Sequence, residues 1–170
     1  MKFDNIPAFE GDNINVIVET PLGSRFKYAY DPLLDVMKMK HHLPKGYFFA
    51  FNFGFIPNTQ AEDGDPLDVV IYSDEVCISG ALMECRVAGA LLASQKENGK
   101  TIRNDRIIAV PAGVKIYDSI KNVRDIDRRV LSQLENFFVS YENYRGILFK
   151  TIKWISSTQA LSTVRNSLKE

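Results

Sequence analysis

Apolar and polar residues alternate over several short stretches in the first two thirds of the chain. Residues 14–19 (INVIVE) and 25–30 (RFKYAY) show this alternation, which is typical of half-buried β-strands. Pro21 and Gly23 lie between the two stretches, so we expect a turn and hence a β-hairpin there. Further apolar runs predict strands at 67–72, at 82–93 with a bend at Gly89, and at 107–110 before Pro111, with a polar hairpin tip at 95–106.

Helical periodicity appears only in the last third of the chain. A stripe of apolar side chains recurs there at helical spacing, comprising Ile126, Val130, Leu131, Leu134, Phe137, Phe138 and Tyr141. Ser156 and Gln159 have the spacing of an N-terminal capping box, and apolar residues with a helical period follow them. Many short strands followed by helices predict an α+β fold, a small barrel or curled sheet with helices packed outside it. A length of 170 residues suits one domain, which we expect to span residues 1–170.

The charge balance and the cysteines narrow the classes of function. Lys and Arg number 21, as do Asp and Glu, so a long basic groove for nucleic acid is not expected. No run approaches ~20 uninterrupted apolar residues, so no membrane span is expected. The N-terminal sequence MKFDNIPAFEGDN lacks the apolar core of a secretory signal. Cys77 and Cys85 lie in apolar surroundings without metal-ligand spacing, which favours reduced core thiols and a cytoplasmic protein.

Carboxylates are most concentrated at residues 62–68, where three aspartates and one glutamate fall within seven positions. Gly64 and the proline two residues later indicate a turn that leads into a strand. Asp63, Asp65 and Asp68 can therefore converge at one sheet edge, where hard carboxylate oxygens suit Mg²⁺, with Mn²⁺ as an alternative. A solvated acidic turn is the competing interpretation, and it is the commoner one for any single Asp-Gly pair. The spacing does not fit an EF-hand loop, and an aspartyl-phosphate phosphatase would be expected to have a strand before its nucleophile.

The run Asp63-Gly64-Asp65-Pro66-Leu67-Asp68-Val69 resembles the signature of the family I soluble inorganic pyrophosphatases. Further segments resemble that family in the same order, namely VIVETP (16–21), FKY (26–28), FNFGFIPNT (51–59), RIIAVP (106–111), YDSI (117–120) and FFVSY (137–141). The resemblance covers most of the chain and implies a five-stranded oligonucleotide-binding (OB)-like β-barrel with flanking helices, mainly C-terminal. It also implies Mg²⁺-dependent hydrolysis of pyrophosphate, or of a related diphosphate, by a homo-oligomer that in bacteria is usually a hexamer.

The resemblance implies a set of metal and water positions in this chain. Asp63 and Asp68 would hold metal, and Asp65 would orient or deprotonate the attacking water. Glu19 would support a more distant, substrate-bound metal, and Asn104 stands in place of a metal-binding aspartate. Bridging Mg²⁺ ions would offset the charge of pyrophosphate and lower the pKa of a bound water, so that hydroxide exists near neutral pH.

The resemblance also implies residues that contact phosphate oxygens. Lys27 and Arg106 would bind them as cations, with Arg106 standing where the family commonly has lysine, and Tyr141 would donate a hydrogen bond. His41 aligns with the family's substrate arginine. Each of these residues alone also fits an ordinary structural role, and their joint order around the acidic signature is what favours function.

Several positions depart from the family pattern, and most of them bear on the chemistry. The departures are Ala29 for a glutamate, His41 for the arginine, Phe49 and Phe53 for two tyrosines, Gln95 and Asn104 for two aspartates, and Glu142 for a lysine. Candidate replacements nearby are Lys40, His42 or Lys45 for the arginine, and Asp105 and Glu97 for the aspartates. Three hypotheses follow: a pyrophosphatase with a drifted site, a non-catalytic relative that binds Mg²⁺ and phosphate, and a hydrolase of an organic diphosphate that stacks on the two phenylalanines.

Overall fold

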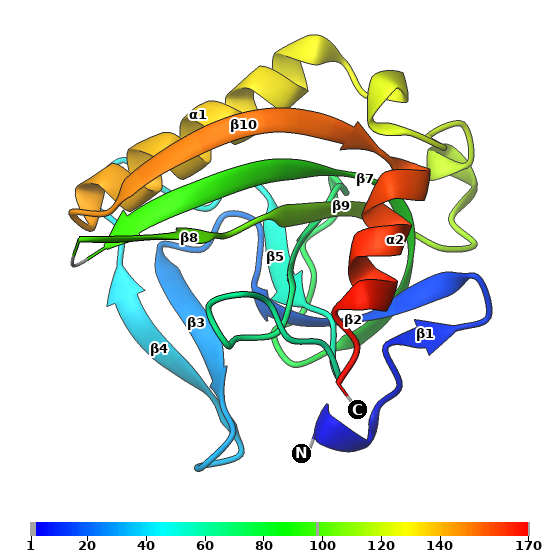
Figure 1. Ribbon diagram of the computed structural model, residues 1–170, viewed down its shortest axis with the longest axis horizontal. Helices are drawn as coiled ribbons and strands as arrows, with labels where there is room; N and C mark the ends of the chain where they lie inside the picture. The colour runs from blue at the N-terminus through cyan, green and yellow to red at the C-terminus, as the bar shows by residue number, and fades with distance from the viewer. Residues whose placement is uncertain (1–2, 98, 170) are drawn as a thin grey trace.

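The computed structural model describes residues 3–97 and 99–169, and β-strands make up most of its regular secondary structure (Figure 1). The strands are β1 (Phe9–Glu10), β2 (Asn13–Thr20), β3 (Phe26–Asp31), β4 (Val36–His42), β5 (Asn52–Phe55), β6 (Asp68–Ile71), β7 (Leu82–Glu97), β8 (Lys100–Arg103), β9 (Arg106–Pro111) and β10 (Leu148–Ser156). The helices are α1 (Arg128–Tyr144) and α2 (Ser157–Asn166), with short 3₁₀ turns at Phe3–Asn5, Lys115–Tyr117 and Val123–Asp125.

Five of the strands pair with one another in a ring. β2 pairs with β5, β5 with β6, β6 with β9, and β9 with β7, and β7 pairs in turn with β2. Only the β6–β9 pairing among these is parallel. β1, β8 and β10 extend the ring at its margins, and β3 with β4 forms a separate two-stranded hairpin beside it (Figure 1). The architecture agrees with the α+β, OB-like barrel and flanking helices expected from the sequence.

Two apolar cores form on opposite faces of the strands, because successive side chains of a strand point to opposite sides. Val69 and Ile71 of β6 belong to one core, which α2 completes with Ala160 and Val164. Val70 belongs to the other core, which lies under α1. Asp68, the first residue of β6, is therefore held in place by buried neighbours on both faces of the strand.

α2 begins at the predicted capping box, whereas α1 begins at Arg128, two residues after Ile126, the first residue of the predicted apolar stripe. The Asp127 side chain accepts a hydrogen bond from the Arg129 amide at 2.7 Å and caps α1. Ser156 and Gln159 form the expected capping box at the start of α2. In Figure 1, α1 lies along β10 at the top of the barrel, and α2 stands at its side.

The hairpin expected between residues 14–19 and 25–30 does not form, because β3 pairs with β4 instead. Both edges of β2 are already occupied by β5 and β7, so no edge is left for β3. Two side chains of β2 contact β3 in place of a ladder: Thr20 Oγ1 donates to the Tyr28 carbonyl at 3.0 Å, and Glu19 accepts from a β3 amide.

Three strands lie in regions where no strand was expected: β1 beside β2, β4 beside β3, and β10 beside β7. The length of β7 was also underestimated. β7 continues to Glu97 and pairs with β8, so much of the predicted polar tip is a regular ladder. The side chain of Glu97 lies outside the described residues. The register of β7 shifts between Val87 and Gly89, which confirms the expected bend.

Neither α1 nor α2, nor any other helix in the described part of the chain, is long and apolar enough to cross a membrane. Cys77 and Cys85 are free thiols, and Cys85 is fully buried, as expected for a core cysteine, whereas Cys77 is only partly buried.

Candidate active site

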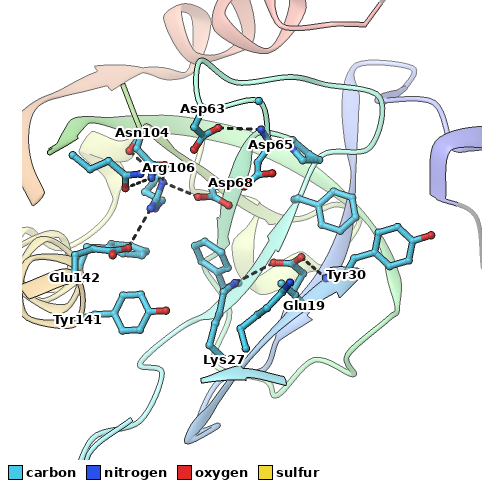
Figure 2. A pocket seen from close by; sticks show the side chains of 18 of the residues that line it. Glu19, Lys27, Tyr30, Asp63, Asp65, Asp68, Asn104, Arg106, Tyr141 and Glu142 are labelled. Carbon is cyan, nitrogen blue, oxygen red and sulfur yellow. Dashed lines mark hydrogen bonds and ion pairs between the residues drawn. The ribbon is translucent and has the colours of Figure 1, made fainter. Parts of the chain in front are cut away.

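The acidic turn between β5 and β6 is held by its own backbone and by a buried threonine. Gly64 has a φ of +92°, a conformation that glycine adopts without steric cost, and it lets the chain reverse. The Asp65 amide donates to Asp63 Oδ1 at 3.1 Å, which closes the turn (Figure 2). Thr59 is fully buried, and its hydroxyl accepts from the Leu67 amide at 2.9 Å. These contacts anchor the turn against the start of β6.

The turn opens onto a cavity of about 850 Å³ that is also lined by the β3–β4 hairpin, β5, β9 and the end of α1. All nine residues predicted as site residues line this cavity: Glu19, Lys27, His41, Asp63, Asp65, Asp68, Asn104, Arg106 and Tyr141. Three nearby residues were candidates to replace the family's arginine, which aligns with His41. Of these, Lys40 lines the cavity, whereas His42 and Lys45 lie outside it. The fold thus brings together side chains that are far apart in the sequence.

Lys27 and Glu19 form an ion pair on one side of the cavity (Figure 2). The Lys27 ammonium lies 3.0 Å from Glu19 Oε2, and the other Glu19 oxygen accepts from the Tyr30 amide at 2.9 Å. The same ammonium stands over the ring of Phe53, 3.9 Å from its centroid. Glu19 is therefore oriented by two donors, and Lys27 by a carboxylate and a phenyl ring.

Arg106 occupies the opposite side, and its side chain is only 3% exposed. Its Nη1 lies 2.7 Å from Asp68 Oδ2, and its Nη2 lies 3.8 Å from Glu142 Oε1 (Figure 2). The guanidinium carbon is also 5.1 Å from the Phe138 ring centroid and 5.5 Å from that of Phe149. A buried cation held between two carboxylates and aromatic rings has a well-defined position.

Asn104 faces the cavity and joins the Arg106 cluster. Its amide nitrogen donates to Gln95, and its oxygen accepts from Arg106 Nη1. Asp105 does not take its place, because that carboxylate pairs with Arg103 at 2.8 Å and does not line the cavity. The alternative that Asp105 takes over the metal-binding role of the aspartate replaced by Asn104, which the sequence left open, is therefore wrong.

His41 and Tyr141 share a hydrogen bond between the imidazole Nε2 and the hydroxyl. Burial lowers the pKa of His41 to about 4, with smaller contributions from the charges of Arg145 and Lys27. Burial also raises the pKa of the Tyr141 hydroxyl, which stays protonated. His41 is thus neutral near pH 7 and does not replace the charge of the arginine that the family resemblance implies there.

Glu142 stands where the family pattern has a lysine, which reverses the charge expected beside a phosphate position. The residue lines the cavity, but its carboxylate is paired. The residue is 2% exposed, and its Oε2 lies 2.7 Å from Arg145 Nη1 while Oε1 faces Arg106. Burial raises the pKa of Glu142, and the two guanidinium groups oppose that rise. Its charge is therefore compensated within the protein.

Arg145 is a cavity residue that the sequence interpretation missed. The helical period contained a signal for it, because Arg145 lies three residues after Glu142 and four after Tyr141. Glu142 in turn lies four residues after Phe138, on the buried stripe of α1. A carboxylate on that stripe requires a cation within reach, and Arg145 is one turn away.

Phe49 and Phe53 line the cavity but offer little surface to a ligand, since they are 1% and 5% exposed. Phe49 packs edge-on against Tyr141, with ring centroids 5.3 Å apart. The ring of Phe53 is covered by the Lys27 ammonium. The hypothesis that these rings stack on an organic group of a diphosphate loses its support, because protein atoms already cover them.

The donor set of the acidic turn suits a hard divalent cation. Partial desolvation raises the pKa of Asp63, and the nearby Asp68 and Asp65 carboxylates add to that rise. A bound cation would favour the ionised form of Asp63 and relieve this repulsion. Within residues 3–97 and 99–169, no three acidic, histidine or cysteine side chains form a ready-made metal cluster. A metal at Asp68 would have to share that carboxylate with Arg106.

The fold and the site define a class: a barrel protein whose cavity places a cluster of carboxylates opposite cationic side chains. Comparison with known proteins specifies the family. A family model described as inorganic pyrophosphatase matches residues 16–170, and the chain belongs to the inorganic pyrophosphatase family.

Individual relatives are similar over most of their length. The inorganic pyrophosphatase of Thermus thermophilus is 35% identical over 145 residues, which cover 85% of this chain and 79% of that protein. The corresponding protein of Synechocystis is 31% identical over 170 residues, covering 99% of this chain and 98% of that one. The crystal structure of the Thermus thermophilus inorganic pyrophosphatase has a TM-score of 0.89 at 31% identity, covering 98% of this chain and 97% of that chain.

Proposed function

We propose that this protein hydrolyses inorganic pyrophosphate to two phosphates with the help of Mg²⁺. The observation that carries the proposal is the cavity itself, where Asp63, Asp65 and Asp68 face Lys27 and Arg106. Pyrophosphate has several negative charges that repel an incoming hydroxide, so the reaction requires both cations and a group that orients water. The names of the relatives support the same substrate.

Asp63 and Asp68 would hold metal, Glu19 would support a more distant, substrate-bound metal, and Asn104 would contribute its amide oxygen. The chemistry that Mg²⁺, or Mn²⁺ in its place, supplies when bound is neutralisation of phosphate charge and a lower pKa for water. Asp65 is exposed, and its carboxylate forms no ion pair with the described residues, so it is available to orient a water and accept its proton.

The remaining residues bind the substrate. Lys27 donates from one side of the cavity and Arg106 from the other, and each has a carboxylate partner that fixes its position before substrate arrives. Tyr141 would donate a hydrogen bond from its hydroxyl to a phosphate oxygen, since the hydroxyl stays protonated. His41 contributes through its hydrogen bond to Tyr141 and not through a charge.

Phosphate release from pyrophosphate in millimolar Mg²⁺ tests the proposal, with the variant Asp65→Asn beside the wild type. The expected result is release that falls by about 10²-fold or more in the variant, because a neutral amide cannot accept the proton of the water. Asp12→Asn is the matched control, since Asp12 is an exposed turn residue that does not line the cavity. Wild-type release no higher than that of Asp65→Asn, in Mg²⁺ and in Mn²⁺, would refute the proposal.

A non-catalytic protein that binds Mg²⁺ and phosphate is the second candidate. The observation in its favour is that Lys27 and Arg106 are already paired with carboxylates, which reduces the charge available to the substrate. Calorimetric titration with inorganic phosphate and Mg²⁺ distinguishes the two candidates when read beside the assay above. Binding without turnover would favour this candidate.

Three further properties belong to the proposal. We expect one pyrophosphatase domain over residues 1–170, a cytoplasmic location, and a homo-oligomer, with a hexamer as the expected size. Large exposed apolar side chains such as Leu33, Val76 and Ile78 support association, since a subunit interface would bury them. Analytical ultracentrifugation tests the size, and the expected mass is six times the 19.3 kDa of one chain.

A further inference from the structure

Arg145 stands at the C-terminal end of α1 with its guanidinium group at the edge of the cavity. The backbone there forms a regular helix end: Gly146 has a φ of +77°, and the Ile147 amide donates a hydrogen bond to the Glu142 carbonyl at 3.0 Å. The guanidinium carbon lies 5.7 Å from the ring centroid of Tyr141. The Arg145 side chain is 36% exposed, so solvent and ligands can reach it.

The surroundings of Arg145 are those of a site that needs a positive charge. Tyr141, the predicted hydrogen-bond donor to phosphate, is hydrogen-bonded to His41, and His41 is uncharged at neutral pH. Arg106 and Arg145 share the carboxylate of Glu142, and Arg106 also pairs with Asp68 at 2.7 Å, so the four charges of this network balance one another. Arg145 is the accessible cation of the network, because its side chain is 36% exposed and that of Arg106 only 3%.

We infer that Arg145 is a substrate-binding residue, which supplies the second phosphate subsite with the cation that position 41 does not provide. The inference rests on the proposed function for the identity of the substrate. A guanidinium group has five N–H donors, and the ion pair with Glu142 uses only part of them. The remaining donors can bind phosphate oxygens in the paired geometry that arginine favours.

Arg145 also links the two halves of the cavity through Glu142. The carboxylate touches Arg145 at 2.7 Å and Arg106 at 3.8 Å, and Arg106 reaches Asp68 at 2.7 Å. A continuous chain of ion pairs thus runs from the acidic turn to the end of α1. The substrate would lie along this chain, with one phosphoryl group near the acidic turn and the other near Arg145 and Tyr141.

The test is to measure the binding of methylenediphosphonate, a pyrophosphate analogue that cannot be hydrolysed, by calorimetry in Mg²⁺. Arg145→Gln should weaken binding by about 10- to 100-fold, and Arg145→Lys should recover part of the loss. Arg129→Gln is the control, because it removes the same charge from an exposed position near the start of α1 that lies outside the cavity. Its affinity should match that of the wild type, and thermal unfolding should be measured for each variant to verify that it is folded.

The steady-state constants separate this inference from the proposed function. If the wild type hydrolyses pyrophosphate and folded Arg145→Gln has unchanged kcat, KM and analogue affinity, the role of Arg145 is refuted while the proposed function stands. If the wild type binds the analogue in an Arg145-dependent way without hydrolysing pyrophosphate, the proposed reaction fails and the subsite stands. An equal loss of analogue affinity in Arg129→Gln would also refute the role of Arg145, because the loss would then follow from the lower net charge of the protein and not from the position of Arg145.

Discussion

Replacing Arg106 by lysine tests whether the buried ion pairs of the cavity act as one unit. The arginine reaches Asp68 with one nitrogen at 2.7 Å and Glu142 with the other at 3.8 Å. A lysine keeps the positive charge but has a single ammonium group, which can stay with one of the two carboxylates and not with both. We therefore expect Arg106→Lys to destabilise the fold although the net charge is unchanged.

The magnitude follows from the contact with Glu142. Two opposite charges 3.8 Å apart attract by about 4 kcal/mol at an effective dielectric constant of about 20, and by about 1 kcal/mol in water. Glu142 is buried but keeps Arg145 as a partner, so its charge is not left uncompensated. A loss of about 2 kcal/mol lies between these limits. With a urea m-value of about 2 kcal/mol per M, the midpoint of unfolding would fall by about 1 M.

Urea unfolding at one fixed protein concentration measures this loss, because association would otherwise shift the apparent stability. Arg103→Lys is the control, since Arg103 is 42% exposed and its pair with Asp105 should change stability by less than about 1 kcal/mol. A double-mutant cycle with Glu142→Gln should give a coupling energy of about 1–2 kcal/mol. Additive effects of Arg106→Lys and Glu142→Gln would contradict the shared network.

Three further predictions concern metal binding, pH dependence and packing. Asp68→Asn should weaken Mg²⁺ binding at least about 10-fold in calorimetric titration, and an affinity equal to that of the wild type would remove the metal interpretation of the acidic turn. The folded-state pKa of His41 is about 4, below its unfolded value of 6.5, so its contribution to stability is present above pH 6.5 and is lost as the pH falls toward 4. NMR titration should show that His41 stays neutral down to about pH 5, and a titration midpoint near 6.5 would contradict this. The variant His41→Gln should lose less stability than the wild type when the pH falls from 7 to 4. Gly54→Ala should cost about 3 kcal/mol in urea unfolding, because a Cβ there would lie 2.1 Å from the Ile17 carbonyl oxygen, and a cost below about 1 kcal/mol would show that β5 can move away from β2.

Local sequence patterns predicted most of the elements that surround the site. The capping box of Ser156 and Gln159 and the apolar stripe of α1 depend on residues three or four positions apart, so they could be located without tertiary information. The acidic turn is equally local, because Gly64 and the Asp63–Asp65 contact determine its shape. β10 was missed, since a half-exposed edge strand with two lysines has no strong apolar run.

The resemblance to a family placed nine site residues in order along the chain, and the fold brings all of them to one cavity. Which cation meets which carboxylate was not predictable. The alignment put His41 at the place of an arginine, but burial leaves it neutral, and the charge near Tyr141 belongs to Arg145. Glu142 appeared as an uncompensated charge only because its two partners come from β9 and from the end of α1.

The sequence by itself determined the positions of the helices, most strands, the acidic turn and the family, because these follow from short-range periodicity and from contiguous motifs. Tertiary structure alone decided that β3 pairs with β4, since both edges of β2 are occupied by strands far along the chain. It alone also decided the charges of the cavity. A charge depends on burial and on partners within a few ångströms, and those partners are set by how β9, β4 and α1 meet and not by their distance in sequence.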